Sequence, residues 1–451
     1  MSDQRQLSED AYLERSPLVF DPWLTTNSRI IEVLGENLAL TFDLNERRQR
    51  RRKARDNTNI ERIIRAILTN LAFVVASGRE PASVAVSLRS VKQKLSPRYD
   101  PKGFGQLTHV LETLSDVKRS ATPVCTLRKS TQRGVASRVT AGDLFNVQTP
   151  SVWKPSWLRP EYFGRASGGE VIRLSRTVRD FVADTRETEL VDYDDTEETV
   201  RFRGEMHRIN HHLASAQMDL LADDTVRMGV FTHRELRRHF KLLQGETAPR
   251  FDLCGRLFGG WWQGLSSMDR MAIRIDGESI ADLDFSSMFL RLAYVQAGLA
   301  PPAGDLYADV FGFAPGPKLR EGAKKVVNAM FFRSTPLSRM PKEARDYFGP
   351  NASGAWIRSK ILEAHTPIRH VFESGGGLGL MFTESQILVA ALLRLVDAGV
   401  TALPMHDGLM VARSKADLTA KVMGDAAEAI TGHRLPISLK SQPEVMAHIK
   451  A

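Results

Sequence analysis

Two aspartates, Asp282 and Asp284, are the first residues whose type and spacing could do chemistry. Residues 279–285 (SIADLDF) alternate apolar and polar side chains, which predicts a strand, and helical spacing begins at Ser286. On a strand, Asp282 and Asp284 project from the same face. An aspartate that ends a strand directly before a helix is a common ligand of a divalent cation, although an isolated one is more often a helix cap.

A second carboxylate lies where two apolar segments meet. Residues 402–411 (ALPMHDGLMV) predict a hairpin whose turn is His406-Asp407-Gly408. A carboxylate between apolar strands is costly unless it is paired or neutralised. We therefore expect a bound metal ion at Asp407.

A basic helix is predicted between the two carboxylate segments. In residues 318–333 (KLREGAKKVVNAMFFR), Arg320 and Lys324 are four positions apart and share one helix face. Cations so placed fit the β- and γ-phosphates of a nucleoside triphosphate, while two metal ions bridge the attacking hydroxyl, the α-phosphate and the leaving group. The expected cofactor is Mg²⁺, as two ions, with Mn²⁺ as a substitute.

Taken together, these segments resemble motifs A, B and C of family A (DNA polymerase I-like) DNA polymerases and of the related phage single-subunit RNA polymerases. The resemblance covers roughly residues 250–451, in the family's order, and it is specific as a set rather than segment by segment. The residues that carry it are Gly255, Arg256, Leu257, Gln263, Arg270, Asp284, Phe285, Ser286, Arg291, Asp305, Leu306, Tyr307, Arg320, Lys324, His406 and Asp407.

The resemblance implies a role for each matched residue. The metal ligands would be the carboxylates of Asp284 and Asp407 and the carbonyl of Phe285, and Lys324 would also protonate the leaving pyrophosphate. The residues implied around the incoming nucleotide are Arg320, Lys324, Phe289, Phe332, Tyr307 and Asn328. Those implied at the primer or template are Arg256, Gln263, Arg270 and His406.

Several positions depart from the family pattern. Phe289 stands where DNA-synthesising relatives carry Glu and RNA polymerases a small residue, and a ring there would exclude a 2′-hydroxyl. Arg333 replaces a usual Gly, and Gly408 replaces the Glu that follows the His-Asp pair in DNA polymerases. Motifs A and C are close together, which predicts reduced fingers. We find no carboxylate set typical of a proofreading exonuclease before Gly255.

The expected fold is mixed α/β: a polymerase right hand with a palm sheet and helical fingers and thumb, preceded by a winged-helix-like domain. The expected parts are a basic arm (1–57), the winged-helix-like nucleic-acid-binding domain (58–150), a linker (151–170), a helical thumb-like region (171–250), the palm (251–300 and 395–451) and reduced fingers (301–394). The palm sheet would include a late strand at 435–439.

The N-terminal part carries the basic and helical patterns. Arg50, Arg51 and Arg52 belong to a run of cations that could be a phosphate-binding arm or a solvated face. Helices at 59–77 and 104–114, followed by strands at 124–127 and 135–139, are typical of a winged helix, with a small α/β packing domain as the alternative. Helices are also expected at 199–221 and, with basic residues that contact phosphates or solvent, at 232–243 (THRELRRHFKLL).

Amino-acid composition limits the possible partners and cellular location of the protein. The chain has 451 residues, 42% of them hydrophobic and 25% charged, and its net charge of +9 favours a polyanionic partner. Two distant cysteines exclude a disulfide framework and a cysteine-rich zinc site. The N-terminus lacks a secretory signal, and the most apolar stretch (386–396) is too short to span a membrane. We expect a cytoplasmic protein without a membrane partner.

The sequence therefore predicts a template-directed DNA polymerase that adds deoxynucleotides to a primer 3′-hydroxyl without proofreading. Its partners would be a primed or single-stranded DNA template, nucleoside triphosphates and other replication proteins, as suits a plasmid, a prophage or another mobile element. Three alternatives stay open. The chain could be a primase or RNA polymerase that uses ribonucleotides, a non-catalytic DNA-binding replication initiator, or a metal-dependent nuclease with Asp282 as its extra carboxylate.

Overall fold

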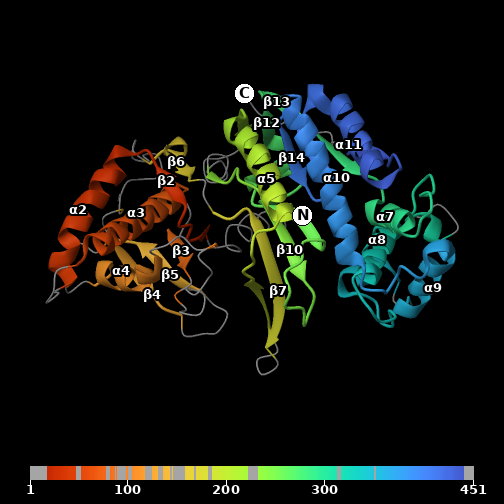
Figure 1. Cartoon of the computed structure of the whole chain (residues 1–451), viewed down its shortest axis with the longest axis horizontal. Helices are drawn as coiled ribbons and strands as arrows, with labels where there is room; N and C mark the ends of the chain where they lie inside the picture. Colours follow the sequence, from red (N-terminus) through yellow and green to blue (C-terminus); the bar gives the residue numbers. More distant parts are fainter. Residues whose placement is uncertain are drawn as a thin grey trace, which may run out of the picture. The chain divides into compact units, whose positions relative to one another are not determined.

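The computed structural model divides the chain into two compact units. The N-terminal unit comprises residues 1–170 and 219–235, and the C-terminal unit comprises residues 171–218 and 236–451. The structure describes residues 18–46, 52–77, 82–86, 88, 98–99, 104–116, 124–130, 136–142, 145, 158–166, 169–180, 185–221, 232–311, 316–349 and 352–440. Helices and strands mix in both units (Figure 1), so the fold is mixed α/β as expected.

The N-terminal unit is organised around one apolar helix. Its helices are α2 (Arg29–Glu46), α3 (Ala54–Ala76) and α4 (Leu107–Leu114), and its strands are β1 (Leu18–Val19), β2 (Leu24–Thr26), β3 (Ser83–Val86), β4 (Cys125–Arg128), β5 (Ser137–Ala141) and β6 (Phe163–Arg165). Helix α3 buries apolar side chains along most of its length, including Ile63, Ile64 and Leu68. One sheet has the order β1-β3-β5-β4, and β2 pairs with β6.

The predicted N-terminal helices and strands are present, with two corrections. Residues 158–165 are not a linker, because Leu158 and Phe163 are buried in the core of this unit and β6 pairs with β2. Arg52 is not part of a free arm either: it is 8% exposed, and its guanidinium lies 5.0 Å from the centre of the Phe42 ring. Arg50 and Arg51 lie outside the described residues.

A four-stranded sheet with the order β11-β10-β7-β8 opens the C-terminal unit. Its strands are β7 (Ile172–Asp180), β8 (Thr185–Leu190), β10 (Arg237–Leu242) and β11 (Cys254–Phe258). Helix α5 (Glu197–Ser215) packs on β7, and a capping box between Thr196 and Thr199 fixes its start. Short strand β9 (Met218–Leu220) follows, where the chain passes to the N-terminal unit. The predicted helix at 199–221 therefore ends at Ser215.

The predicted helix at 232–243 is wrong, and the region 171–250 is not mainly helical. Residues 237–242 form β10, in which Arg238, Phe240 and Leu242 are buried on one face and the alternate residues are half-buried on the other. The apolar residues of this segment fit both the helical and the strand periodicity. The segment forms a strand because it pairs with β7 and β11. Arg238 is fully buried, and its cation stacks on Phe202 at 4.4 Å.

The second sheet of this unit carries the predicted carboxylates. Its strands are the short β9 at one edge, β12 (Ile273–Ile275), β13 (Glu278–Phe285), β14 (Ala402–Met405), β15 (Gly408–Ala412) and β16 (Ile437–Leu439). Strand β13 is central, because it pairs antiparallel with β12, β15 and β16. The predicted strand at 279–285, the hairpin around Asp407 and the late strand are all confirmed.

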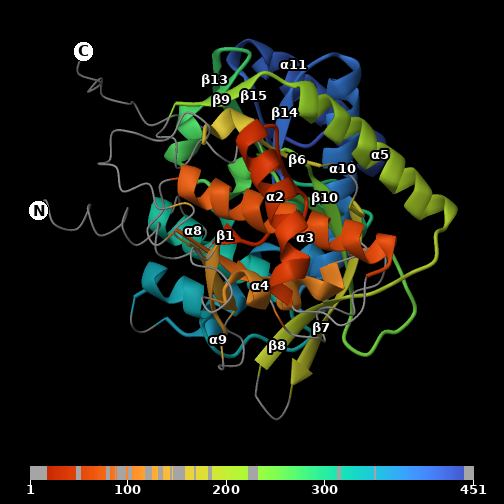
Figure 2. The same ribbon diagram turned by 90° about the vertical axis from the view of Figure 1, so that its left-hand side faces the viewer.

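Helices cover this sheet and fill the segment between its strands. They are α7 (Met288–Gln296), α8 (Pro317–Phe331), α9 (Gly354–Ala364), α10 (Gly377–Asp397) and α11 (Ala416–Thr431). Helix α10 contacts α5, α7, α11 and β11, and Figures 1 and 2 both show it beside α5. Because α10 runs through residue 394, no boundary between fingers and palm falls there.

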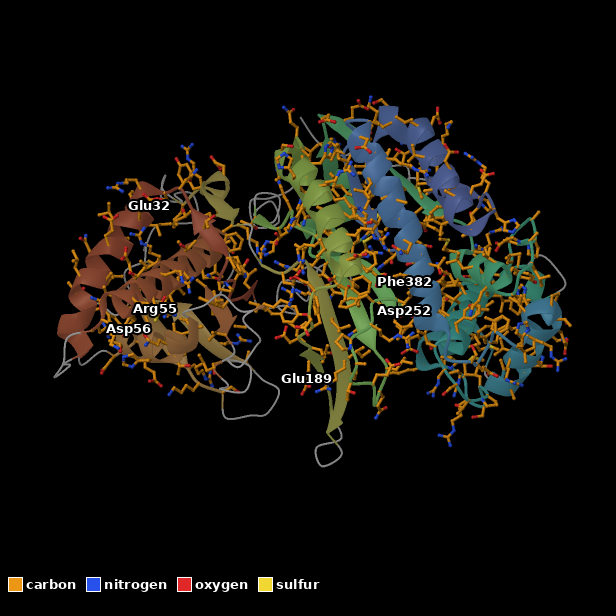
Figure 3. All side chains as sticks on the ribbon, viewed as in Figure 1. Glu32, Arg55, Asp56, Glu189, Asp252 and Phe382 are labelled. Atoms are coloured by element: carbon orange, nitrogen blue, oxygen red, sulfur yellow. The ribbon has the colours of Figure 1, made fainter. Side chains whose placement is uncertain are left out.

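Helix α10 alone among the described helices is long and apolar enough to cross a membrane by length and composition. Half of its apolar window is buried inside the protein, and Glu384 and Ser385 are among its buried side chains. Phe382, labelled in Figure 3, extends from it towards β10, where its ring lies 6.4 Å from the ring of Phe240. Helix α10 is therefore a core helix of this unit.

Candidate active site

The two predicted carboxylates meet at one end of the β13–β15 pair. In the antiparallel register Asp284 lies opposite Gly408, and the carbonyl of Asp407 accepts a hydrogen bond from the N–H of Phe285 at 3.4 Å. His406 turns the chain with a left-handed backbone (φ 57°), which directs Asp407 back to β13. Strand pairing thus brings together Asp284 and Asp407, which are 123 positions apart in the sequence (407 − 284).

Close approach at this point requires glycine at residue 408. A Cβ there would lie 2.6 Å from the carbonyl oxygen of Leu283 and 2.7 Å from Oδ1 of Asp284. These separations are below any normal carbon–oxygen contact. The Glu that the resemblance leads one to expect here could not be accommodated without moving β13 away from the hairpin.

The electrostatics of the pair favour a bound cation. The pKa of Asp407 is raised to about 8, first by burial and then by the like charges of Asp284 and Glu384. Oδ1 of Asp284 is buried and has no hydrogen-bond partner among the described residues. A buried carboxylate oxygen without a donor costs free energy that a metal ion would recover.

These features fit Mg²⁺, which is bound through one or two carboxylates with waters and substrate phosphates completing its shell. Asp284 and Asp407 would hold it. Within the described part of the chain, no group of three or more His, Cys, Asp or Glu side chains is arranged as a metal site. A metal bound here would therefore depend on substrate oxygens, water and backbone carbonyls such as that of Phe285.

A lysine that the sequence did not single out faces the two carboxylates of β13, Asp282 and Asp284. Nζ of Lys440, directly after β16, lies 3.2 Å from Oδ2 of Asp284 and 3.4 Å from Oδ1 of Asp282. Burial raises the pKa of Asp282, and the charge of Lys440 lowers it by less, so that the pKa is raised overall. One ammonium group thus neutralises both carboxylates of β13.

Arg256, predicted to contact primer or template, is held by a buried carboxylate. Its Nε and Nη2 lie 2.6 Å and 3.0 Å from the two oxygens of Glu384 on α10. Its guanidinium carbon lies 5.5 Å from the centre of the Phe289 ring. Burial raises the pKa of Glu384, although the Arg256 charge opposes the shift. Arg256 therefore has one defined position beside the predicted nucleotide site.

Helix α8 presents the predicted triphosphate ligands. Arg320 pairs with Asp305 and lies 5.6 Å from the ring of Tyr307. Lys324, one turn further, is half-buried and makes no ion pair or hydrogen bond within the described part of the chain. Burial raises the pKa of Tyr307 and the charge of Asp407 raises it further, so this hydroxyl lies within electrostatic reach of the carboxylate site.

Aromatic side chains connect α7 to the end of α8. The Phe289 ring, 8% exposed, packs edge-on against Phe332 with ring centres 5.9 Å apart. Phe332 is 44% exposed and rests on Gly377, where a Cβ would lie 2.6 Å from the ring. Asn328 is half-buried as a residue, and its buried Oδ1 accepts no hydrogen bond from the part of the chain that the structure describes. The structure thus brings the predicted gate residue and the predicted stacking residue together.

One predicted ligand, Gln263, and one residue that only carries the resemblance, Arg291, are already used inside the protein. Oε1 of Gln263 accepts from the N–H groups of Gly259 and Gly260, and its Nε2 donates to the carbonyls of Leu257 and Pro404. With its amide fully engaged, Gln263 braces the loop after β11 and has no free polar group for a nucleic acid. Arg291 is 2% exposed and donates to backbone carbonyls, so it also has a structural role.

Arg270 and His406 are the other two residues implied at the primer or template. Arg270 donates a hydrogen bond to the Leu265 carbonyl at 2.8 Å. Its charge acts to lower the pKa of Asp282 and that of His406. His406 is exposed at the turn and makes no hydrogen bond within the described residues. Arg333 donates to the backbone of Thr335. Glu384 and Lys440 are the site residues that the sequence did not reveal.

Comparisons with known proteins found a distant structural likeness and no matching family model or curated protein. No family model matches the chain, and no curated protein matches it. The chain is similar to a solved structure, the POL domain of Pol1 from M. smegmatis in complex with DNA primer-template and dNTP, with 11% identity and a TM-score of 0.26 over 53% of this chain and 50% of that one. The aligned part spans only half of that domain, and such a likeness carries no argument about function.

Proposed function

We propose that the C-terminal unit is a template-directed nucleotidyltransferase that adds nucleotides to the 3′-hydroxyl of a DNA primer. The observation that carries this proposal is the pairing of β13 with β15, which places Asp284 beside the turn that holds Asp407. Two carboxylates alone would fit several metal-dependent reactions. The basic face of α8 adds what a triphosphate needs, because Arg320 and the unpaired Lys324 lie on one helix face.

In this proposal each side chain binds, orients or neutralises. Asp284 and Asp407 would hold two Mg²⁺ ions, which supply charge stabilisation to the α-phosphate and activate the primer hydroxyl. Lys324 and Arg320 would bind the β- and γ-phosphates, and Lys324 would donate a proton to the departing pyrophosphate. Tyr307 would form the wall of the phosphate site next to α8. Arg256 and Arg270 would orient the primer terminus.

We further propose that the incoming nucleotide is a deoxynucleotide. Phe289 is buried between Phe332 and the Arg256 guanidinium, so its ring cannot swing away without losing both contacts. A 2′-hydroxyl directed at this ring would be excluded sterically and would find no hydrogen-bond donor on it. A ribonucleotide-using primase or RNA polymerase is the alternative that this side chain disfavours.

The N-terminal unit would bind duplex DNA. The order of elements along the chain is that expected of a winged helix: helix α3, strand β3, helix α4 and the β4–β5 hairpin. The sheet order β3-β5-β4 also fits this fold. In the hairpin Arg128 lies opposite Arg138, and both are exposed without an ion pair within the described residues. Like charges in this arrangement are destabilising unless an anion binds them.

Primer extension tests the proposal. Purified wild-type protein would be incubated with a primed DNA template, Mg²⁺ and either deoxy- or ribonucleotides, beside Asp407→Asn and the matched surface variant Asp397→Asn. We expect extension with deoxynucleotides that the Asp407 variant loses and the Asp397 variant keeps. Extension with ribonucleotides alone would move the protein to the primase class. No Asp407-dependent product in either mixture would leave a DNA-binding protein without this activity.

A further inference from the structure

Glu384 is buried beside the candidate site without being one of its expected ligands. It is 2% exposed, in the middle of an apolar helix, and a buried carboxylate there would be costly without its pairing to Arg256. The charge of Glu384 raises the pKa of Asp407, and the charge of Asp284 raises the pKa of Glu384 itself. A hydrophobic residue would pack this position at lower cost, so a role in positioning a cation explains the carboxylate better than packing does.

The geometry restricts the Arg256 guanidinium on two sides. The carboxylate of Glu384 receives Nε and Nη2, an edge-on bidentate contact that fixes the plane of the group. The guanidinium carbon lies 5.5 Å from the centre of the Phe289 ring, which bounds the group on another side. Nη1 is left without a hydrogen-bond partner within the described residues, so it can bind a ligand while the other two nitrogens remain held.

The support behind Glu384 is also built into the fold. Gly255, which precedes Arg256, has a left-handed backbone (φ 73°), and a Cβ on it would lie 2.4 Å from Oγ of Ser385. Strand β11 and α10 are therefore in close contact at this point. The buried Arg238 joins the same junction by donating to Ser385 and, at 2.7 Å, to Gln386. Glu384 and Arg256 thus lie on two elements that cannot slide independently.

We propose that Glu384 is a positioning residue that holds Arg256 against Phe289, so that its free Nη1 binds the primer terminus. This inference rests on the proposed function and adds to it the residue that fixes the primer-binding arginine. Without the Glu384 charge, the guanidinium would be drawn towards the carboxylate of Asp407, whose charge already acts on Arg256. Arg256 would then leave the primer and compete with metal for the catalytic pair.

The test is a double-mutant comparison with matched controls. Wild-type, Glu384→Gln, Arg256→Ala and the double variant would be compared by single-nucleotide extension of matched and 3′-mismatched primers and by thermal unfolding. Asp397→Asn, which removes a carboxylate charge from the exposed end of the same helix, is the control for charge. Asp407→Asn shows whether extension depends on the candidate site.

We expect Glu384→Gln to lower extension of the matched primer roughly 10- to 100-fold, as for a lost charged hydrogen bond. It should do so mainly through kcat, with little change in KM for the nucleotide, and Asp397→Asn should have no effect. In the Arg256→Ala background the same change should have no further effect on extension. It should instead raise the melting temperature, because Arg256→Ala leaves the buried carboxylate unpaired.

The contrary results are distinct. Equal losses from Glu384→Gln with and without Arg256 would show that Glu384 acts independently of that arginine, and the inference would be wrong. Full activity of Glu384→Gln, with Asp407-dependent extension by the wild type, would also overturn it while leaving the proposed function intact. No Asp407-dependent extension by the wild type would overturn both. Glu384→Asp, which keeps the charge but withdraws it by one methylene, should show the same pattern if Glu384→Gln does not fold.

Discussion

A side chain at residue 408 would collide with Asp284. A Cβ on Gly408 would lie 2.7 Å from Oδ1 of Asp284 and 2.6 Å from the carbonyl oxygen of Leu283, which leaves no room for even one methyl group. Strand pairing and the carboxylate site therefore depend on the same glycine. Gly408 is a departure from the DNA polymerase pattern, and here it is a geometric requirement.

Gly408→Ala should consequently abolish nucleotide incorporation and destabilise the protein by about 1–3 kcal/mol, because the methyl group overpacks a contact with backbone. Gly204→Ala on α5 is the matched control, since a Cβ there meets nothing within 4 Å. Urea unfolding and single-nucleotide incorporation would be measured on both variants. Retained activity in Gly408→Ala would show that Asp284 and Asp407 need not approach as closely as the structure has them.

Replacement of Phe289 tests the choice of sugar. Phe289→Ala should lower the preference for deoxynucleotides roughly 10–200-fold, the range expected when one steric contact in a pocket is lost. Phe289→Leu, which keeps most of the bulk, should retain most of that preference. The ratio of kcat/KM for each deoxynucleotide and its ribonucleotide, measured below the melting temperature of the variant, gives the result. An unchanged ratio would mean that another group excludes the 2′-hydroxyl.

The Lys440 contact predicts a competition with metal. Lys440→Met leaves the carboxylates of Asp282 and Asp284 without their ammonium partner, so the melting temperature in EDTA should fall. Mg²⁺ should then raise it by more than it does in the wild type, because the metal neutralises a larger uncompensated charge. Lys421→Met, which removes a lysine from a surface ion pair, is the control. Equal stabilisation by Mg²⁺ in all three proteins would contradict this account.

The β4–β5 hairpin predicts DNA binding by the N-terminal unit. Arg128→Gln and Arg138→Gln together should weaken duplex binding and reduce the salt dependence of the affinity by about two phosphate contacts. Stability should stay equal or rise, because two facing like charges are removed. Arg29→Gln on α2 is the exposed control from the same unit. Fluorescence anisotropy over a range of salt concentrations would show an unchanged slope if the hairpin is not a contact.

Local patterns are enough to predict the elements that carry the site. Alternation around Asp284, the apolar arms of the Asp407 hairpin and the four-residue spacing of Arg320 and Lys324 each depend on neighbours within a few positions. The structure forms β13, the β14–β15 hairpin and α8 at these places. The pairing of the first two can be expected only through the resemblance, since no local pattern brings residues 284 and 407 together.

Long-range partners explain what the sequence does not predict. Arg256 and Glu384 are 128 positions apart, and nothing near Glu384 distinguishes it from other polar residues of an apolar helix. Lys440 lies 158 positions from Asp282. Residues 237–242 fit a helix only if Arg238 is a solvent-facing cation, whereas it is fully buried with Glu205 and Gln386 as partners. A buried arginine inverts the polarity pattern that predicts the helix.

The most direct test of the account is template-directed incorporation of a single nucleotide. Four primed templates that differ only in the first templating base would each be offered all four deoxynucleotides separately, with wild-type protein, Asp284→Asn, Asp407→Asn and the surface control Asp397→Asn. We expect the wild type and the control to add only the complementary nucleotide and to release pyrophosphate, and both site variants to add none. Addition that ignores the template, or that persists in both site variants, would contradict it.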